Sequence, residues 1–511
     1  MLAEIHTAAL LGVEGFPVTV ECKVTKGLPE LSIVGLPDHA VLEAEDRVQS
    51  AMESVGIPFP SAKILINMAP ADQKKIGSSY DLALLLGILL GAEILKADTA
   101  GCCFLGELSL GGKVKGVRGA LCMCLAAKTA GFHTVFVPAD NAEEAAVAKG
   151  ITVYGVDSVK ALLDHLTGKA PLTPVVFDDA VFAKEVLRSP FDFSEVRGQE
   201  KAKRAMEIAA AGGLNLLMIG PPGTGKSMLA KRLPSILPPM TYEEALDCTA
   251  IYSGAGCLPG GKPILTKRPF RSPHHTMSAA ALVGGGTIPV PGEISLAHNG
   301  VLFLDELPEY NRQAAESLRQ PLEDGQVTVT RTAGRFTFPS RFMLVCAMNP
   351  CRCGYYGHPT RPCTCRKEDI QKYLAKISGP LLDRMDLQIE VPPVRFEEMA
   401  GNTPSESSAA IRERVKKARD FAAARFAAAG DRQILSNASM TPAQIRRHCE
   451  MDEKASELLK SAFERLGLSA RGHDRLLRVA RTIADLDASE KIGPQHMAEA
   501  IQFRALDRKY F

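Results

Sequence analysis

Short, almost uninterrupted apolar segments recur in the middle of the chain, between longer stretches with helical spacing. They occupy residues 214–219, 300–304 and 342–347. Strands covered by helices on both faces of a parallel sheet have this pattern. The spacing therefore predicts an α/β domain with a parallel sheet at its centre, over residues 191–400.

The first 168 residues also mix the two kinds of pattern. Strands are predicted at residues 31–34, 63–67, 134–138 and 151–154, and helices over 38–55 (with Asp38 as its N-cap) and from about residue 141. The apolar run 82–92 is too short to cross a bilayer, which needs about twenty residues, so it predicts a buried helix. A second α/β domain is expected here.

From about residue 405 the pattern is helical. Helices are predicted over residues 409–429, 441–467 and 470–487, and from 493 to the end. Pro442 and Pro494 stand at helix starts, where a missing N–H costs little. Proline- and glycine-containing stretches near residues 168–174 and 401–408 separate the three blocks. The expected order is a domain over 1–168, a linker over 169–190, the sheet domain, and a helical domain over 405–511.

Composition limits the class of protein. The 511 residues are 46% hydrophobic and 23% charged, which is typical of soluble globular chains with several domains. The net charge of +2 excludes a polycation that coats nucleic acid and leaves a local basic channel open. The chain has 13 cysteines, and its sequence shows neither the pattern of a secretory signal nor that of a membrane span. We therefore expect reduced thiols and a cytoplasmic location without membrane contact.

A phosphate-binding motif follows the first apolar strand of the sheet domain. Its pattern is G-x-x-x-x-G-K-[ST], between a strand and a helix, where backbone N–H groups can surround phosphates. Lys226 is expected to reach the β- and γ-phosphates, and the Ser227 hydroxyl to bind Mg²⁺. The motif consists of Gly220, Pro221, Pro222, Gly223, Thr224, Gly225, Lys226 and Ser227.

Polar residues follow the next two strands. Asp305 is expected to hold Mg²⁺ through water, and Glu306 to orient or deprotonate the attacking water. Asn349 is placed to hold the same water, although a turn residue before Pro350 is the plainer interpretation. The combination favours hydrolysis of a nucleotide over binding alone.

Together with segments 196–200, 269–276, 379–386 and 480–486, these motifs resemble an AAA+ ATPase, and more narrowly the magnesium-chelatase-like ComM/YifB family. The resemblance covers nearly the whole chain. It implies ATP and Mg²⁺ as cofactors and a hexameric ring with nucleotide between subunits. It also implies that Arg384 is an arginine finger and Arg471 the helical-domain arginine called sensor 2, with an ordinary ion pair as the alternative for both.

The resemblance also places an insertion in the second helix between Lys226 and Asp305, and a hairpin before the Asn349 strand. Residues 326–331 and 335–338 alternate around Thr332, Ala333 and Gly334, which is typical of a hairpin. In related ring helicases such a hairpin lines the pore, so Arg331 and Arg335 are candidate DNA contacts. A solvated hairpin without a ligand is the equal alternative.

Four cysteines gather in fifteen residues after Asn349. Four thiolates can hold a tetrahedral Zn²⁺, and we favour structural zinc, with His358 as a spare. Reduced thiols and a redox-labile disulfide remain alternatives. The candidate ligands are Cys351, Cys353, Cys363 and Cys365.

The first domain resembles a Lon-type protease domain (the S5 domain 2-like fold). The resemblance puts Ser79 at the nucleophile position and Leu121 at the position of the lysine base. A leucine cannot accept a proton, so the expected domain has no peptidase activity, although Lys113, Lys115 or Lys128 could substitute.

The leading hypothesis is a cytoplasmic AAA+ ATPase ring that moves on DNA, with branch migration during recombination or DNA uptake as its task. An ATP-dependent protease or unfoldase and a magnesium-chelatase motor subunit are the alternatives. Protein partners, DNA polarity and subunit count stay open.

Overall fold

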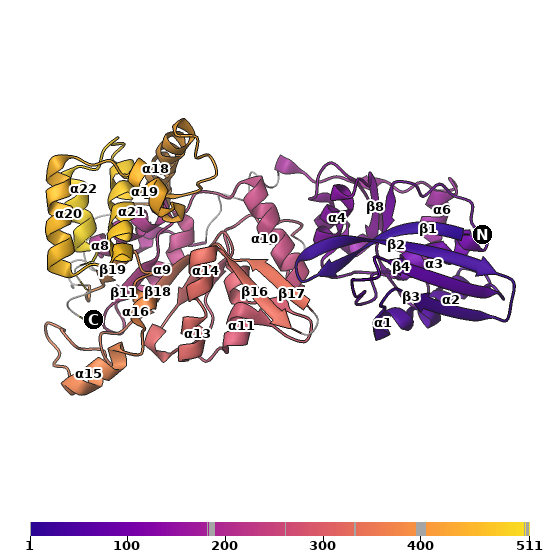
Figure 1. Ribbon diagram of the computed structural model, residues 1–511, viewed down its shortest axis with the longest axis horizontal. Coiled ribbons are helices and arrows are strands. Elements are labelled where there is room, and N and C mark those ends of the chain that lie inside the picture. The colour runs from indigo at the N-terminus through magenta and orange to yellow at the C-terminus, as the bar shows by residue number, and fades with distance from the viewer. Residues whose placement is uncertain are drawn as a thin grey trace.

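The computed structural model describes residues 2–180, 182, 190–260, 262–331, 334–394, 405–504, 506 and 510. The molecule is elongated, with the N-terminal domain at one end and the sheet domain and C-terminal helices at the other (Figure 1). The first half of the second predicted seam, residues 401–404, lies outside the described residues.

An eight-stranded mixed sheet forms the N-terminal domain, in the order β10-β9-β8-β5-β1-β2-β4-β3. Its strands are β1 (Leu2–Leu11), β2 (Glu14–Thr25), β3 (Glu30–Val34), β4 (Lys63–Ala69), β5 (Cys102–Phe104), β8 (Thr134–Pro138), β9 (Thr152–Val156) and β10 (Pro174–Val175), and β6 (Glu107–Leu108) pairs with β7 (Val114–Lys115) beside it. The helices are α1 (His39–Leu42), α2 (Ala44–Ser54), α3 (Asp81–Gly91), α4 (Ala120–Thr129), α5 (Ala142–Ala146) and α6 (Val159–Leu166).

Most predicted elements of this domain are confirmed, including β3, β4, β8, β9 and the buried helix α3. Asp38 caps α1 as predicted, accepting a hydrogen bond from the backbone N–H of Val41 at 3.0 Å, but the predicted helix is divided at Glu43 into α1 and α2. The long β1–β2 hairpin was not predicted. β10 pairs with β9, so the sheet extends beyond the predicted boundary at residue 168.

The second domain contains the predicted parallel sheet, in the order β12-β15-β18-β11-β19. All neighbouring strands in it are parallel. The strands are β11 (Leu216–Ile219), β12 (Phe270–Arg271), β15 (Val301–Leu304), β18 (Met343–Met348) and β19 (Leu387–Glu390). The helices are α8 (Glu200–Gly212), α9 (Lys226–Arg232), α13 (Arg312–Glu316), α14 (Arg319–Asp324), α15 (Lys367–Leu374) and α16 (Gly379–Leu382).

The interval between α9 and β15 holds the additional elements expected there. They are α10 (Tyr242–Ala255), α11 (Ala279–Val283), the small hairpin β13 (Gly284–Gly285) with β14 (Val290–Pro291), and α12 (Glu293–Leu296). The predicted later hairpin is also present as β16 (Gln326–Arg331) and β17 (Gly334–Pro339).

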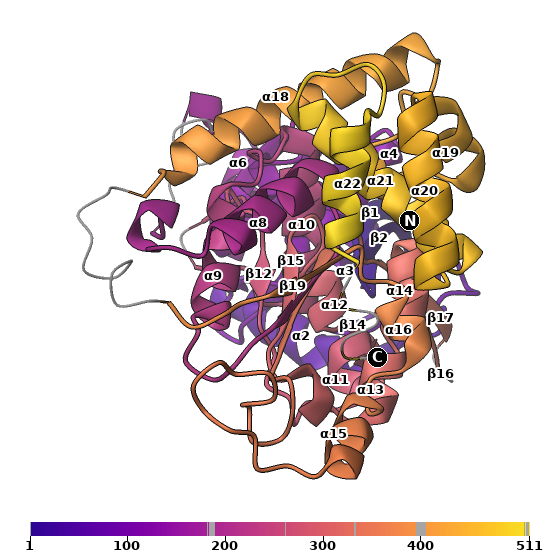
Figure 2. The same cartoon turned by 90° about the vertical axis from the view of Figure 1, so that its left-hand side faces the viewer.

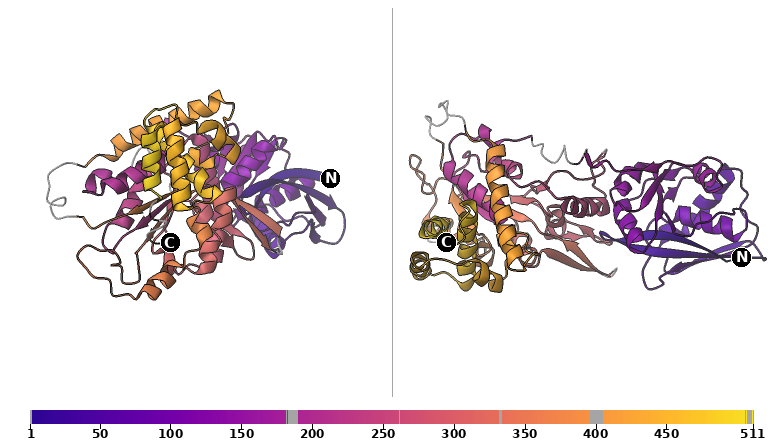
Figure 3. Two further views of the ribbon diagram at one scale, coloured as in Figure 1. Left: turned by 60° about the vertical axis from the view of Figure 1, so that its left-hand side comes forward. Right: turned by 90° about the horizontal axis from the view of Figure 1, so that it is seen from above.

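The N-terminal domain contacts these elements at several points, which include α4 and the turn between β1 and β2. Helix α10 packs on α4, where the Cys122 thiol donates to the Ala250 carbonyl at 3.2 Å. The turn between β1 and β2 reaches the β16–β17 hairpin: a Cβ on Gly12 would lie 3.0 Å from the Phe338 ring. The view from above shows α10 at this junction (Figure 3).

The C-terminal domain is helical, as predicted. It consists of α18 (Ser408–Ala428), α19 (Pro442–His448), α20 (Glu453–Leu466), α21 (Ala470–Leu486) and α22 (Pro494–Gln502). α18 and α21 pack against α8 of the sheet domain (Figure 2). The single helix predicted over 441–467 is wrong, because Met451 bridges to Ile492 and Asp452 caps a new helix. Within the described residues, no helix has the length and apolar character needed to span a membrane.

Candidate functional site

The carboxyl ends of β11, β15 and β18 meet at one edge of the sheet and form a cavity of about 390 Å³. The phosphate motif follows β11, Asp305 and Glu306 follow β15, and Asn349 follows β18. Parallel strands present these ends to a common crevice, where ligands of α/β sheets bind. The lining residues are Pro222, Gly223, Thr224, Gly225, Lys226, Ser227, Met228, Asp305, Glu306, Met348 and Asn349.

Lys226 is one of the residues that line this cavity. Its ammonium donates hydrogen bonds to the carbonyl oxygens of Gly220 at 2.7 Å and Pro221 at 2.9 Å, and to Asn349 Oδ1 at 3.2 Å. Burial lowers the pKa of Lys226 to about 8, against the opposing effect of the Asp305 and Glu306 carboxylates. The structure therefore brings Asn349, the residue predicted to hold the attacking water, next to the phosphate motif.

Ser227 and Asp305 provide two adjacent oxygen atoms. The Ser227 hydroxyl donates to Asp305 Oδ2 at 2.5 Å, and Asp305 Oδ1 accepts from the backbone N–H of Glu306 at 3.0 Å. Oxygen ligands of this kind suit Mg²⁺, which also keeps several waters and binds phosphate oxygens. The pair therefore fits a magnesium ion carried by a triphosphate.

Glu306 begins the turn after β15 in the left-handed region, with φ of 52°. Its side chain is 56% exposed and its Oε2 lies 3.3 Å from His275 Nδ1. His275 was not predicted as a site residue, although the segment Pro273-His274-His275 is part of the sequence that resembles the family. Two adjacent histidines beside a proline were the available signal.

The two predicted arginines meet away from this cavity. Arg384, 3% exposed, donates to the Pro380 carbonyl at 2.6 Å and pairs with Glu323 of α14. Arg471, 62% exposed, lies 3.7 Å from the same Glu323 carboxylate. Neither arginine lines the phosphate cavity of its own chain. Both therefore make the ion pair that was the alternative interpretation, and they share one partner.

Arg331 and Arg335 lie at the turn end of the β16–β17 hairpin. Both are exposed, and Thr330 pairs with Arg335 across the strands. Arg331 Nη1 donates only to the neighbouring Thr330 carbonyl, at 3.0 Å, among the described residues. Residues 332 and 333 of the predicted turn lie outside the described residues. The two guanidinium groups are available to an external anion.

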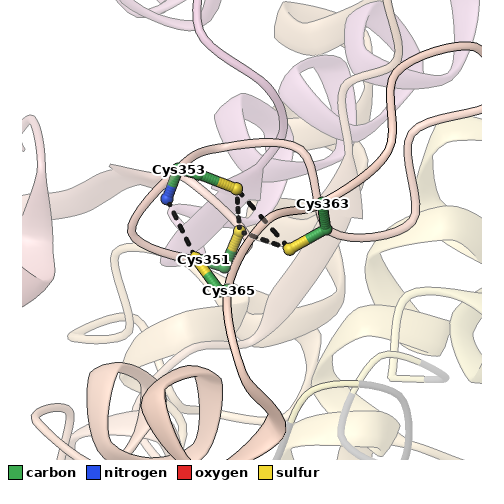
Figure 4. Close-up of side chains that lie close together, drawn as sticks. All are labelled: Cys351, Cys353, Cys363 and Cys365. Carbon is green, nitrogen blue, oxygen red and sulfur yellow. Dashed lines mark hydrogen bonds between the residues drawn. The ribbon is translucent and has the colours of Figure 1, made fainter.

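The four predicted cysteines converge, with all four sulfur atoms within 4.8 Å of one another (Figure 4). The Sγ–Sγ distances are 3.4 Å for Cys351–Cys353, 3.6 Å for Cys351–Cys363 and 3.5 Å for Cys353–Cys363. Ligands 2.3 Å from a tetrahedral zinc lie about 3.8 Å apart. Burial opposes ionisation of Cys353, but the backbone N–H groups of Tyr355 and Thr364 lower its pKa to about 5. The donor set therefore fits Zn²⁺.

The cysteine loop touches the phosphate motif directly. A Cβ on Gly354, which has φ of 87°, would lie 2.5 Å from Pro222 Cδ. Cys351 is fully buried and follows Asn349 by two residues. Anything that orders this loop therefore also constrains Pro222 and Asn349.

Among the described residues of the N-terminal domain, Ser79 is not paired with a lysine. Leu121 is fully buried in α4, and Lys128 donates to the Ala148 carbonyl at 3.1 Å. Lys75, also fully buried, donates to the Gln73 carbonyl at 2.9 Å and to the Pro70 carbonyl. Within the described residues, no lysine amine hydrogen-bonds to Ser79.

A parallel sheet with helices around it and a helical C-terminal part is consistent with the magnesium-chelatase-like AAA+ fold. Three family descriptions match the chain: "Magnesium chelatase, subunit ChlI" over residues 192–399, "Subunit ChlI of Mg-chelatase" over 20–141, and "Magnesium chelatase, subunit ChlI C-terminal" over 405–504.

Whole-length relatives narrow the assignment. The chain is 45% identical to the protein YifB of Escherichia coli (strain K12) over 510 residues, which covers 99% of this chain and 98% of the relative. It is 41% identical to the competence protein ComM of Haemophilus influenzae over 519 residues, with the same coverage. A weaker similarity, 25% over 224 residues, covers 40% of this chain and 22% of the DNA replication licensing factor Mcm2 of Drosophila melanogaster. The chain belongs to the magnesium-chelatase-like ComM/YifB family.

The lowered pKa of Lys226 predicts a pH-dependent affinity for ATP. Without nucleotide, half of the Lys226 amines are neutral near pH 8, and binding to a triphosphate requires the charged form, so a proton is taken up above that pH. We expect the Kd for ATP to rise about eightfold between pH 7.5 and 9. Calorimetry in two buffers of different ionisation enthalpy measures both the Kd and the proton uptake.

Lys226→Arg is the matched control, because a guanidinium stays protonated over this range. The variant is expected to bind ATP more weakly than the wild type at pH 7.5, without the rise in Kd toward pH 9. A wild-type affinity that is independent of pH, with no proton uptake, contradicts the assignment of Lys226.

Proposed function

We propose that this protein is an AAA+ ATPase that hydrolyses ATP between the subunits of a ring and uses the energy to move on DNA. The observation that carries the proposal is the convergence of Lys226, the Ser227–Asp305 pair, Glu306 and Asn349 on one cavity. That set contains groups for phosphate binding, magnesium binding and water activation.

In this proposal each group has one task. Backbone N–H groups of the phosphate motif and Lys226 hold the β- and γ-phosphates. Ser227 and Asp305 would hold Mg²⁺, whose charge would stabilise the negative charge that develops on the phosphate oxygens. Glu306 accepts the proton of the attacking water or polarises it, and Asn349 orients that water. ATP is then cleaved to ADP and orthophosphate.

No arginine of the described part of the chain lines the cavity, and this supports assembly. Arg384 lies elsewhere, and its buried Nε has no hydrogen-bond partner among the described residues. An arginine that stabilises the transferring phosphoryl group can come from a neighbouring subunit. We propose that Arg384, with Arg471 beside it, serves the nucleotide of the next subunit at each interface of a hexameric ring.

DNA is the proposed polymer. Support comes from the relatives, since one is a competence protein and another a DNA replication licensing factor. The exposed Arg331 and Arg335 on the β16–β17 hairpin add a local phosphate-binding feature to a chain of nearly neutral net charge. Helicase action with branch migration during recombination or DNA uptake is the task that we propose.

A magnesium-chelatase motor is the second candidate function, and the three family descriptions favour it. Stimulation of the ATPase by DNA, rather than by a porphyrin, separates the two. We also propose that the N-terminal domain is Lon-like and has an assembly or substrate-contact role without peptidase activity, since Ser79 has no lysine partner among the residues described. Casein cleavage that is lost in Ser79→Ala would revive the protease alternative.

We also propose that the four cysteines hold a structural Zn²⁺. The sulfur spacing fits tetrahedral coordination, and the loop contacts the phosphate motif through Gly354 and Pro222. The ion would brace the loop and take no part in hydrolysis.

DNA stimulation tests the proposed function through the hairpin. We expect forked DNA to raise the ATPase rate of the wild type, and the double variant Arg331→Ala, Arg335→Ala to lose that increase while its DNA-free rate stays within about twofold, because the hairpin lies away from the cavity. The slope of log Kd for DNA against log salt should fall by about 1.4 to 1.8, as for two lost phosphate contacts. ATPase assays and fluorescence anisotropy measure these quantities.

The matched control is Lys416→Ala, Lys417→Ala, which removes two exposed charges from α18. It should leave the stimulation and the salt slope unchanged. An ATPase that no DNA structure stimulates would contradict the proposed polymer.

Zinc content has its own test. Purified wild-type protein is expected to hold about one equivalent of zinc per chain. The double variant Cys353→Ser, Cys363→Ser should hold less than about 0.3 equivalents and should unfold at a lower temperature, because metal binding contributes to folding. Cys257→Ser, at an exposed cysteine outside the cluster, is the control. Metal analysis of the wild type that finds no zinc, in protein purified without chelator, contradicts the site.

A further inference from the structure

A second cavity, of about 340 Å³, lies at the other end of α9 from the phosphate motif. Helix α9 begins at Lys226, which lines the phosphate cavity, and Lys231 near its end lines the second cavity. The five residues between them correspond to a helical rise of about 7.5 Å. Among the described residues, no side chain lines both cavities, so a ligand of one does not occupy the other.

The walls of the second cavity are mainly apolar. They are formed by four prolines together with the side chains of Phe191, Leu237, Met240 and Phe270. Proline and aromatic rings have few rotatable bonds, so they lose little conformational entropy when a ligand packs against them. Mostly apolar pockets of about 300–1,000 Å³ bury drug-sized molecules. The size and the walls therefore suit a small organic molecule.

The charged side chains that line this cavity are all basic, and one of them is neutralised within the chain. The Arg268 guanidinium pairs with Glu244 at 2.8 Å and donates to the Pro238 carbonyl at 2.7 Å. Arg268 therefore belongs to the wall of the cavity and has little charge to offer a ligand.

The other three cations have no counter-ion. Lys231, Lys267 and Arg412 form no ion pair with a carboxylate among the described residues. The two lysines are exposed, and Arg412 is partly buried, with Nη1 donating to the Ser235 carbonyl at 3.1 Å. Apolar walls exclude water and so strengthen the attraction between these cations and an anion in the cavity. The charges therefore favour an acidic ligand.

Several parts of the chain meet at this cavity. Phe191 belongs to the segment that leads into the sheet domain, and Phe270 to the edge strand β12. Lys231 belongs to α9, and Arg412 to α18 of the C-terminal domain. A ligand in the cavity would therefore contact the sheet domain and the C-terminal helices at the same time.

We propose that this cavity is a binding site for an organic anion with an apolar body, separate from the nucleotide site. The apolar body lies against the aromatic and aliphatic walls, and the acidic group faces Lys231, Lys267 and Arg412. A neutral molecule would leave these three cations without a partner, and an inorganic anion would leave the walls in contact with water. The inference goes beyond the proposed function, because it requires neither ATP hydrolysis nor DNA.

Two probes with the same aromatic body test the site on the full chain. Anilinonaphthalene sulfonate is an anion whose fluorescence rises in apolar surroundings, and N-phenylnaphthylamine lacks the sulfonate and is neutral. We expect the wild type to bind about one equivalent of the sulfonate per chain in a fluorescence titration. A saturating, non-hydrolysed ATP analogue with Mg²⁺ should not displace it, because the two cavities share no lining residue.

Charge reversal tests the cations. The double variant Lys231→Glu, Lys267→Glu should raise the Kd for the sulfonate at least about tenfold, because two attractions become repulsions, and should leave the Kd for the neutral probe within about twofold. The control Lys416→Glu, Lys417→Glu reverses two exposed charges of α18 that do not line the cavity, and should leave both Kd values unchanged. Met240→Trp fills the cavity and should weaken the binding of both probes.

Three results would overturn the proposal. One is an equal affinity for the sulfonate in the wild type and in Lys231→Glu, Lys267→Glu, since the probe then binds without these cations. Another is displacement by the ATP analogue, which would place the probe in the phosphate cavity. The third is the absence of a saturable signal. If Met240→Trp unfolds at a lower temperature than the wild type, the variant at the two exposed lysines carries the comparison.

Discussion

The parallel alignment of β11, β15 and β18 is the constraint on which the site depends, because it brings three carboxyl ends to one edge of the sheet. The phosphate motif, the acidic pair and Asn349 are far apart in the sequence and meet only there. Lys226 bridges two of the strand ends through Asn349 and its own loop carbonyls. Burial of Lys226 in the absence of a phosphate disfavours the charged form of its amine. A bound triphosphate would favour the charged form again.

Around that edge the groups are divided among separate elements. The cysteine loop packs against Pro222. His275, in the segment between β12 and α11, pairs with Glu306. Arg384 and Arg471 both form ion pairs with Glu323, outside the cavity. A site built in this way can be controlled through three separate contacts. They are the contacts between subunits, the contact of the cysteine loop with Pro222, and the contact of the β12–α11 segment with Glu306.

Local patterns predicted the parts of the structure that local sequence determines. The apolar runs gave the strands of the parallel sheet, and the glycine-rich motif gave its phosphate loop. The break between α19 and α20 was missed because it depends on Met451 pairing with Ile492, a contact that no local spacing reveals. The β1–β2 hairpin was missed for a similar reason, since burial of both its faces comes from α3 and α4. The cysteine spacing predicted that the four thiols form a cluster. The partners of Arg384, Arg471 and Glu306 could be identified only from the tertiary structure.

The central claim is that ATP is cleaved between subunits, and mixing two inactive variants tests it most directly. Lys226→Ala removes phosphate binding and Arg384→Ala removes the arginine offered to the neighbour, so each pure ring should be inactive. In equimolar mixed rings about one interface in four combines an intact Lys226 with an intact Arg384, and the mixture should regain about a quarter of the wild-type rate per subunit. If native mass measurement shows mixed rings whose rate only equals the mean of the two pure variants, or shows a monomer under saturating ATP, the account is contradicted.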